Sequence, residues 1–166
     1  MKIDIQKLRN GSHRFEFDTT GEELELVHDK ISFGKIHVSS VIDKNDQNIL
    51  VTNRVSAEVK GQCDNCLADF ERELKDSFML FYTTDPRTAD EEGSVRIVSS
   101  GARDIDLTEG IRDNLLLDLP MRFLCDENCK GLCPGCGVNL NEDVCTCNKE
   151  IMDPRWEALK DIFKKK

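Results

Sequence analysis

The cysteines are the residues of this chain whose type and spacing point to chemistry. The chain has eight of them. Its first residues, MKIDIQKLRN, contain no apolar stretch of the kind found in secretory signals, so we expect the protein in the cytoplasm. That compartment is reducing, and clustered cysteines there indicate metal binding or redox chemistry before disulfides. They fall into one early pair and one late cluster: Cys63, Cys66, Cys125, Cys129, Cys133, Cys136, Cys145 and Cys147.

The last four cysteines have the pattern of a structural zinc site. Cys133 and Cys136 lie in the sequence C-P-G-C-G. This sequence is typical of a zinc knuckle, because the glycines permit positive φ and let backbone N–H groups face the sulfurs. Cys145 and Cys147 follow after a short loop that can return to the metal. Four thiolates at about 2.3 Å from Zn²⁺ form a closed site with no position for a reactive water.

The other four cysteines allow two arrangements. In the first, the early pair joins Cys125 and Cys129 in a second tetrathiolate site, which closes a loop of about 60 residues. In the rival arrangement, Cys125 and Cys129 bind metal with Cys133 and Cys136, and the early pair is a separate dithiol. A thioredoxin-like dithiol belongs at a helix N-terminus, whereas the flanks of this pair alternate like strands. We therefore predict up to two Zn²⁺ ions per chain, and keep a redox dithiol as a third hypothesis.

Alternation of apolar and polar residues predicts a β-rich N-terminal half. Residues 34–43 and 49–59, joined by a polar turn, indicate a long antiparallel hairpin with one wet face. Alternation continues from Phe70 to Tyr82, where Asp76 interrupts the apolar face and favours a bend or bulge. Shorter strands are predicted at residues 13–18, 23–26 and 94–98.

Two helices are predicted after these strands. The first begins with Asp106 or Thr108 as N-cap and ends at Pro120, and the second begins at Asp153 and Pro154. The fold class is therefore α+β: an antiparallel β-rich N-terminal barrel or sandwich, a helix, a Cys-rich zinc-binding segment and a C-terminal helix. We divide the chain into a β-rich domain with its helix, residues 1–124, and a Cys-rich zinc segment plus a C-terminal helix, residues 125–166, packed on the first part. A single domain is the alternative.

Composition restricts the class of function. The chain has 166 residues, with 32 acidic and 23 basic side chains and a net charge of −9. No apolar run approaches the roughly 20 residues of a membrane span. A negative surface disfavours binding of nucleic acid through bulk electrostatics. The charge is concentrated in residues 63–124, which hold 14 acidic and 7 basic side chains and a net charge of −7.

No catalytic set stands out in the sequence. The three histidines, His13, His28 and His37, lack metal-ligand spacing and are expected on strand surfaces. The sequence has no G-x-S-x-G, no phosphate-binding glycine loop and no dinucleotide fingerprint. A tetrathiolate zinc site leaves no coordination position for a nucleophilic water. We therefore predict that the protein is not an enzyme.

A set of motifs spread along the chain resembles a known family. The most specific stretch is G-L-C-P-x-C-G-x-N-L-N at residues 131–141. Together these motifs resemble the YceD family of bacterial and plastid proteins over about residues 10–165. One position departs from the resemblance: Asn114 stands where the family leads us to expect Glu before L-L-L-x-L-P, which puts any function of that Glu in doubt. The other motifs are Cys63-x-x-Cys66, Asp106-Leu107, Leu117-Asp118-Leu119-Pro120, Cys145-x-Cys147 and Asp153-Pro154-Arg155.

The resemblance implies a role in accumulation of large-subunit ribosomal RNA. We expect a non-catalytic factor that supports 23S rRNA processing by binding the precursor. The alternative partner is a small basic protein of the large subunit, encoded beside bacterial members, which the acidic middle segment would escort. Neither a membrane nor DNA is expected as a partner. An acidic chain needs a local basic patch to bind RNA, and the candidates, each also explicable as a solvated helix end, are Lys130, Lys149, Arg155, Lys160, Lys164, Lys165 and Lys166.

Overall fold

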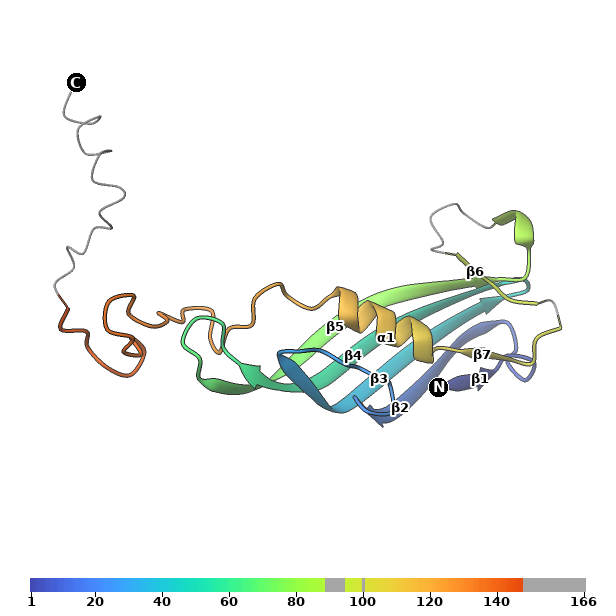
Figure 1. The fold of residues 1–166 in the computed structure, drawn as a ribbon. Coiled ribbons are helices and arrows are strands. Elements are labelled where there is room, and N and C mark those ends of the chain that lie inside the picture. The colour runs from blue at the N-terminus through green and yellow to red at the C-terminus, as the bar shows by residue number, and fades with distance from the viewer. Residues whose placement is uncertain (89–94, 100, 148–166) are drawn as a thin grey trace, which may run out of the picture.

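The computed structural model describes residues 1–88, 95–99 and 101–147 (Figure 1). The described residues form two β-sheets, one α-helix and a single 3-10 turn, η1. Their order along the chain is β1 Lys2–Asp4, β2 Gly11–Thr20, β3 Ile31–Asn45, β4 Asn48–Gln62, β5 Asp69–Thr83, η1 Pro86–Thr88, β6 Val95–Ile97, β7 Asp104–Asp106 and α1 Thr108–Leu117.

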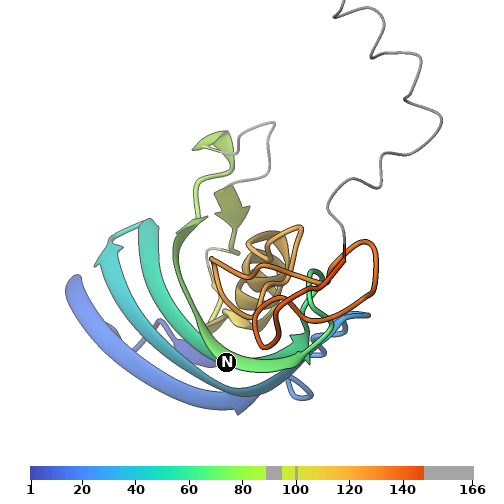
Figure 2. The ribbon, with the colours of Figure 1, turned by 90° about the vertical axis from the view of Figure 1, so that its left-hand side faces the viewer.

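A five-stranded sheet forms most of the structure. Its strands lie in the order β2-β3-β4-β5-β6, and every neighbouring pair is antiparallel except β5 and β6. The sheet curls around α1, as Figure 2 shows. A two-stranded antiparallel sheet of β1 and β7 adds to the covering of the concave face. The Cys-rich segment lies beyond one end of the long strands, next to the turn between β4 and β5 (Figure 1).

The predicted hairpin is confirmed. β3 and β4 pair over their length and are joined by Asp46 and Gln47, where Asp46 has a φ of 45°. The short strands predicted at residues 13–18 and 94–98 correspond to β2 and β6. The face of β4 that was predicted to be apolar is buried: Ile49, Val51, Val55, Ala57 and Val59.

Three details of the prediction are wrong. The sheet does not close into a barrel, because α1 and the β1–β7 pair already cover its concave face. Residues 23–26 form part of a turn, and Leu24 and Leu26 bury their side chains without joining the sheet. β5 runs through Asp76 in unbroken register, and the irregularity lies instead in β3, between Phe33 and Ile36.

The predicted first helix is α1, and the predicted second helix lies outside the described residues. The predicted N-cap, Asp106 or Thr108, is wrong, because Leu107 holds that position. The side chain of Asp106 accepts a 2.9 Å hydrogen bond from the backbone N–H of Thr108. The helix lies close to β5: a Cβ on Gly110 would stand 2.6 Å from Cδ1 of Leu80, so only glycine fits there without a shift. Asn114 donates a 2.8 Å hydrogen bond to the carbonyl of Gly110. No helix among the described residues is long and apolar enough to cross a membrane.

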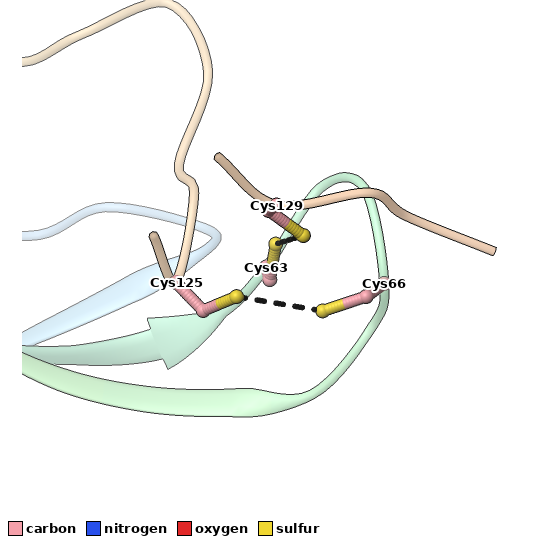
Figure 3. A group of neighbouring side chains, drawn as sticks. All are labelled: Cys63, Cys66, Cys125 and Cys129. Atoms are coloured by element: carbon pink, nitrogen blue, oxygen red, sulfur yellow. Dashed lines mark hydrogen bonds between the residues drawn. The ribbon is translucent and has the colours of Figure 1, made fainter. Parts of the chain in front are cut away.

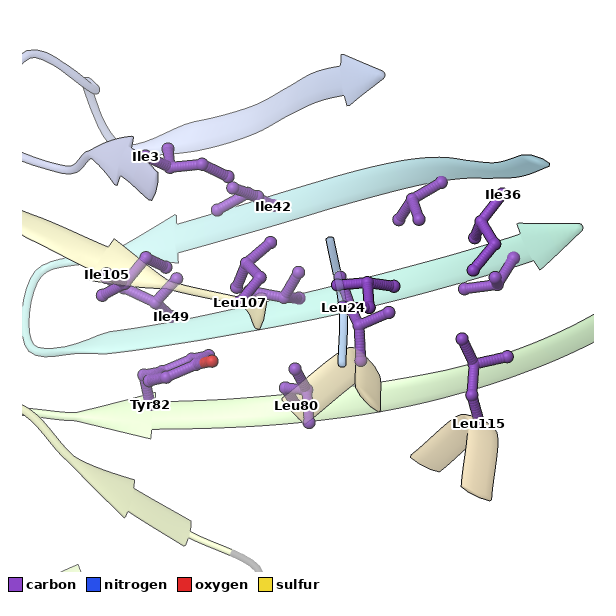
Figure 4. Packing of buried hydrophobic residues seen from close by; sticks show 14 of the residues in the cluster. Ile3, Leu24, Ile36, Ile42, Ile49, Leu80, Tyr82, Ile105, Leu107 and Leu115 are labelled. Atoms are coloured by element: carbon purple, nitrogen blue, oxygen red, sulfur yellow. The ribbon is translucent and has the colours of Figure 1, made fainter. Parts of the chain in front are cut away.

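The main core lies between the concave face of the sheet and α1 (Figure 4). Side chains from the sheet meet Leu107, which precedes the helix, and Ile111 and Leu115, which lie along it. Burial of this apolar area, at about 25 cal/mol per Å², is what holds the helix in the curved sheet. The fully buried side chains of the core include Ile36, Val38, Ile42, Val51, Leu107 and Ile111.

One polar pair interrupts this core. The Ser40 hydroxyl donates a 2.7 Å hydrogen bond to Oδ1 of Asn53, both side chains are buried, and Nδ2 of Asn53 has no partner within the described residues. We predict that Ser40→Ala alone lowers the free energy of unfolding by about 1–3 kcal/mol, because it leaves the Asn53 oxygen unpaired as well. Ser40→Ala with Asn53→Leu should regain most of that loss in urea unfolding. The prediction would be contradicted if the double variant lost as much free energy of unfolding as the two single variants together.

Candidate metal centres

Four cysteine sulfurs meet beside the turn that joins β4 to β5 (Figure 3). Cys63 and Cys66 lie in that turn, and Cys125 and Cys129 come from the segment after α1. The Sγ atoms of Cys63 and Cys129 are 3.8 Å apart, and those of Cys66 and Cys125 are 3.6 Å apart. All four sulfurs lie within 4.8 Å of one another. We call this set the first tetrad.

A second tetrad follows within the Cys-rich segment. It consists of Cys133, Cys136, Cys145 and Cys147, whose sulfurs again all lie within 4.8 Å of one another. The Sγ atom of Cys145 is 3.2 Å from that of Cys133 and 3.7 Å from that of Cys136. The first tetrad is more deeply placed, because both of its residues from the sheet turn are buried, whereas only Cys133 is buried in the second.

The donor set and its spacing fit a tetrahedral metal ion. Four sulfurs at about 2.3 Å from one ion would lie about 3.8 Å from each other. The four sulfur–sulfur distances given above, from 3.2 to 3.8 Å, are near that value. A tetrahedral set of four thiolates is typical of zinc or of iron–sulfur centres.

The structure therefore groups the cysteines as the first of the two predicted arrangements does. The rival arrangement would bring Cys125 and Cys129 to Cys133 and Cys136, and these pairs lie in different tetrads. The first tetrad also takes two cysteines from each side of residue 124, where the sequence suggested a domain boundary. The Cys-rich segment is thus tied to the sheet at its beginning.

Both C-x-x-C loops have the same backbone geometry. The carbonyl of Cys63 accepts a 2.9 Å hydrogen bond from the backbone N–H of Leu67. The carbonyl of Cys133 accepts a 2.8 Å hydrogen bond from that of Gly137. In each loop the backbone N–H of the residue two positions after the first cysteine donates a 3.4 Å hydrogen bond to the sulfur of that cysteine. The fifth residue has positive φ in both: 59° at Leu67 and 75° at Gly137. Glycine adopts this conformation freely, so the second loop has the residue that the geometry favours, and the first does not.

Hydrogen bonds around Asp64 and Asn65 fasten the Cys-rich segment to the sheet. The backbone N–H of Asp64 donates to the carbonyl of Phe123 at 2.7 Å, and the Asp64 carboxylate accepts from the N–H of Phe123 at 2.8 Å. Lys30 also binds this carboxylate, at 2.6 Å, and keeps the pKa of Asp64 below its usual value. The carbonyl of Asn65 accepts from the N–H of Leu132 at 3.0 Å. A small second core surrounds this junction and contains Ile31, Val59, Cys63, Cys66, Phe70 and Phe123.

Asn141 links the two tetrads and was not identified from the sequence as a site residue. Its Nδ2 group donates to the sulfur of Cys129 in the first tetrad at 3.3 Å, although Asn141 belongs to the loop between Cys136 and Cys145. Its Oδ1 accepts from the N–H of Lys130 at 2.8 Å. The only sequence signal was its place at the end of the N-L-N stretch, where asparagine favours tight turns.

Each tetrad contains one thiol that ionises easily and others that do not. Burial opposes ionisation of Cys63, but hydrogen bonds from the backbone N–H groups of Cys66 and its neighbours outweigh burial and lower the pKa of Cys63 to about 6. The backbone N–H of Cys136 is the largest of the causes that lower the pKa of Cys133 to about 6. Hydrogen bonding among the crowded thiols raises the pKa of Cys125 to about 12. Full ionisation of a tetrad therefore needs a cation, and metal binding releases protons.

The predicted RNA-binding residues are only partly within the described chain. Lys130 is exposed beside Cys129 in the Cys-rich segment. The other six lie outside the described residues: Lys149, Arg155, Lys160, Lys164, Lys165 and Lys166.

Comparison with known proteins identifies the family. The family model described as "Large ribosomal RNA subunit accumulation protein YceD" matches residues 51–163. The chain belongs to the YceD family. The matched residues hold most of β4, all of β5 and α1, and both tetrads, so the part of the chain that YceD proteins share includes the two metal-binding candidates.

Similar YceD-type chains occur in bacteria and plants. An uncharacterized protein of Mycobacterium tuberculosis is 31% identical over 98% of this chain and 81% of its own length. The Bacillus subtilis protein YlbN is 29% identical over 99% of this chain and 97% of its own length. A chloroplast protein of Arabidopsis thaliana, named large ribosomal RNA subunit accumulation protein YCED homolog 1, is 37% identical over 36% of this chain and 19% of its own length. No solved structure matches this chain.

Proposed function

We propose that this protein supports accumulation of large-subunit ribosomal RNA by binding the RNA precursor, without catalysis, through its Cys-rich end. The observation that carries the proposal is the match to a family named for that RNA, over residues that include both tetrads. The tetrads serve as structural Zn²⁺ sites that give shape to a segment with few apolar residues. Such a role is compatible with the cytoplasm or the chloroplast.

A structural role for the tetrads follows from their ligand number. Four thiolates fill a tetrahedral coordination shell, so no position is left for water or substrate. The histidines are engaged locally and not with the cysteines. His13 bonds the carbonyl of Arg9 at 2.8 Å, and His37 pairs with Asp18 at 2.8 Å, which raises the pKa of His37. These features support a binding function over an enzymatic one.

Some acidic side chains of the middle segment, residues 63–124, form ion pairs. Glu71 pairs with Lys60 at 3.0 Å, and Glu73 pairs with Lys75 at 2.9 Å. Asp85 forms a 2.9 Å pair with Arg87. Lys75 and Arg87 already count in the segment's net charge of −7, so the segment stays acidic, and we propose RNA binding because the family is named for that RNA.

Lys130 and the three lysines that close the sequence are expected to carry RNA affinity. We predict that Lys130→Ala combined with Lys164→Ala, Lys165→Ala and Lys166→Ala weakens binding of a large-subunit rRNA precursor by about tenfold or more. A plot of log affinity against log salt has a negative slope, and its magnitude should decrease by about 1 for each phosphate that the variant no longer neutralises. The measurement is a gel-shift titration with the metal-loaded full chain at several salt concentrations.

A control removes three basic charges from the start of the chain, one fewer than the variant above. Lys2, Lys7 and Arg9 are exposed and precede β2, far from the cysteines in Figure 1. Their replacement by alanine should leave RNA binding unchanged. Equal losses in the two variants would show non-specific electrostatics, and absence of any RNA binding would overturn the proposal. Co-purification of a basic ribosomal protein without RNA would favour escort instead.

A further inference from the structure

The β2 strand is an open edge of the large sheet. β2 is the terminal strand in the order β2-β3-β4-β5-β6, and Figure 2 shows it along the rim. It is ten residues long, contains no proline and pairs with β3 in unbroken register. Proteins usually block such edges with proline, bulges or short strands, because exposed N–H and C=O groups invite another strand.

The register shows which backbone groups face the open edge. The two-residue turn between β3 and β4 makes Asn45 and Asn48 a hydrogen-bonded pair, so even-numbered residues of this part of β3 bond to β2. Ser40 lies opposite Phe15, so the odd-numbered residues of β2 use their backbone groups for β3. Among the even-numbered residues of β2, the carbonyl of Thr20 accepts from the N–H of Leu24 at 3.2 Å, and no other backbone hydrogen bond within the described residues uses the rest of this set. The residues that direct N–H and C=O groups to the open edge are therefore Ser12, Arg14, Glu16 and Asp18.

The charges along this edge are complementary to themselves. The same even-numbered side chains are exposed on the convex face. A second strand added at this edge would therefore place its side chains opposite Arg14, Glu16 and Asp18. We propose that β2 pairs antiparallel with β2 of a second copy of this chain, about a two-fold axis at Phe15. Arg14 then lies opposite Glu16 of the second copy, and the two-fold symmetry repeats this pair. Ser12 lies opposite Asp18 of the second copy.

Other registers are less favourable. An even-numbered residue of one β2 strand must pair with an even-numbered residue of the other, because these are the residues whose backbone groups face the edge. The two residue numbers of each pair therefore add up to an even number, and the two-fold axis passes through a residue of β2. An axis at Arg14 sets that residue against its own copy, and an axis at Glu16 does the same for the carboxylate. Like charges directly opposite each other destabilise a strand pair. An axis at Phe17 sets Glu16 against Asp18. The axis at Phe15 gives two opposite-charge pairs with no like-charge pair.

The concave side of the same edge is aromatic. Phe15 and Phe17 are half-buried, pack against the main core, and stack with their ring centroids 6.4 Å apart. With the axis at Phe15, this residue and its copy form a non-hydrogen-bonded pair, in which facing side chains approach most closely. Phe17 then lies opposite His13 of the second copy. Association would thus cover aromatic surface that one copy leaves half open.

Net charge opposes this association and is screened by salt. Each copy carries a charge of −9, so two copies repel at low ionic strength. At about 0.15 M salt the screening length is about 8 Å, which weakens the long-range repulsion more than the contact between paired side chains. The dimer should therefore be tested near that ionic strength.

The test is the mass of the metal-loaded full chain in sedimentation equilibrium at about 0.15 M salt. We expect a species of twice 18.9 kDa. Arg14→Glu alone, or Glu16→Arg alone, sets like charges opposite each other twice and should weaken dimerisation by at least about tenfold. Arg14→Glu together with Glu16→Arg exchanges the two charges and should restore the dimer. This inference does not depend on RNA binding.

The control uses a similar pair away from the edge. Arg54 and Glu58 are exposed on β4, which has neighbours on both sides, so Arg54→Glu with Glu58→Arg should leave the mass unchanged. A chain that is monomeric at all concentrations overturns the proposal. So does a dimer that both single variants leave intact, or a folded double variant, judged by circular dichroism, that stays monomeric.

Discussion

Cys63→Ser is expected to remove one of two bound Zn²⁺ ions and to release the segment from Leu119 to Cys147 from the sheet. Cys63 is fully buried at the end of β4, in the first tetrad. Structural zinc sites contribute apparent binding free energies of about 10–16 kcal/mol near neutral pH, and this binding energy drives folding of the site. Loss of one thiolate therefore removes most of what orders the start of this segment.

The hydrogen bonds at the junction are too few to replace the metal. Asp64 and Asn65 hold the backbone of Phe123 and Leu132, but each such bond contributes only about 0.5–1.5 kcal/mol net. The strands do not need the tetrad, since their core is the separate cluster around α1. We thus expect far-ultraviolet circular dichroism to keep its β signal. Amide hydrogen exchange should become fast in residues 119–132 and stay slow in β3 and β4, while residues 133–147 keep the intact second tetrad.

Cys147→Ser is the matched variant in the second tetrad. It should also lower the metal content from two ions to one, measured by elemental analysis, but fast exchange should be confined to residues 133–147. The first tetrad and its junction with Phe123 remain intact in that variant. Two ions in either variant, or slow exchange throughout residues 119–132 of Cys63→Ser, would contradict the structural role of the first tetrad.

The cysteine spacing predicted the candidate ligands but not their grouping. Cys133 and Cys136 were assignable because their loop sequence carries the geometry of a knuckle within a few residues. Grouping Cys63 with Cys129 depends on a contact between segments 66 positions apart. The turn after β4 and the segment after α1 meet because the helix runs back along the sheet, and no local pattern encodes that path.

Alternation predicted which faces are buried, but not what buries them. The faces of β4 and β5 were correctly identified, yet the sheet was expected to close into a barrel or to form a sandwich. Closure depends on whether another element fills the concave side, and here Leu107 and Ile111 do so. Residues 23–26 show the same limit. Leu24 and Leu26 alternate like a strand and are buried, but the N–H of Leu26 bonds the carbonyl of Gly21 within a turn.

The contact with Asn141 could not be read from the sequence for a related reason. An asparagine after a tight turn usually bonds its own loop, and Asn141 does bond Asn139 at 2.9 Å. Its second role, toward the sulfur of Cys129, exists only because the loop of the second tetrad folds back on the first. The candidate residues of a site are thus local in sequence, whereas the contacts that combine them are not.

Leu107→Ala is expected to lower the free energy of unfolding by about 2–5 kcal/mol. Leu107 is fully buried between β7 and α1, where it joins the helix to the curved sheet. Its truncation removes apolar packing and leaves a cavity that the surrounding strands can fill only in part. Domains of this size are stable by about 5–15 kcal/mol in total, so this single change removes a large share.

Leu117→Ala is the matched control, because it makes the same truncation at the other end of the same helix. Leu117 is 83% exposed, so its replacement should change stability by no more than about 0.5 kcal/mol. Urea unfolding of the metal-loaded chain, followed by circular dichroism, compares the two directly. If the two variants lose equal stability, the helix is not held in the sheet by its first turn. If only Leu107→Ala loses stability, then burial at that turn is what makes the open, curved sheet stable without closing into a barrel.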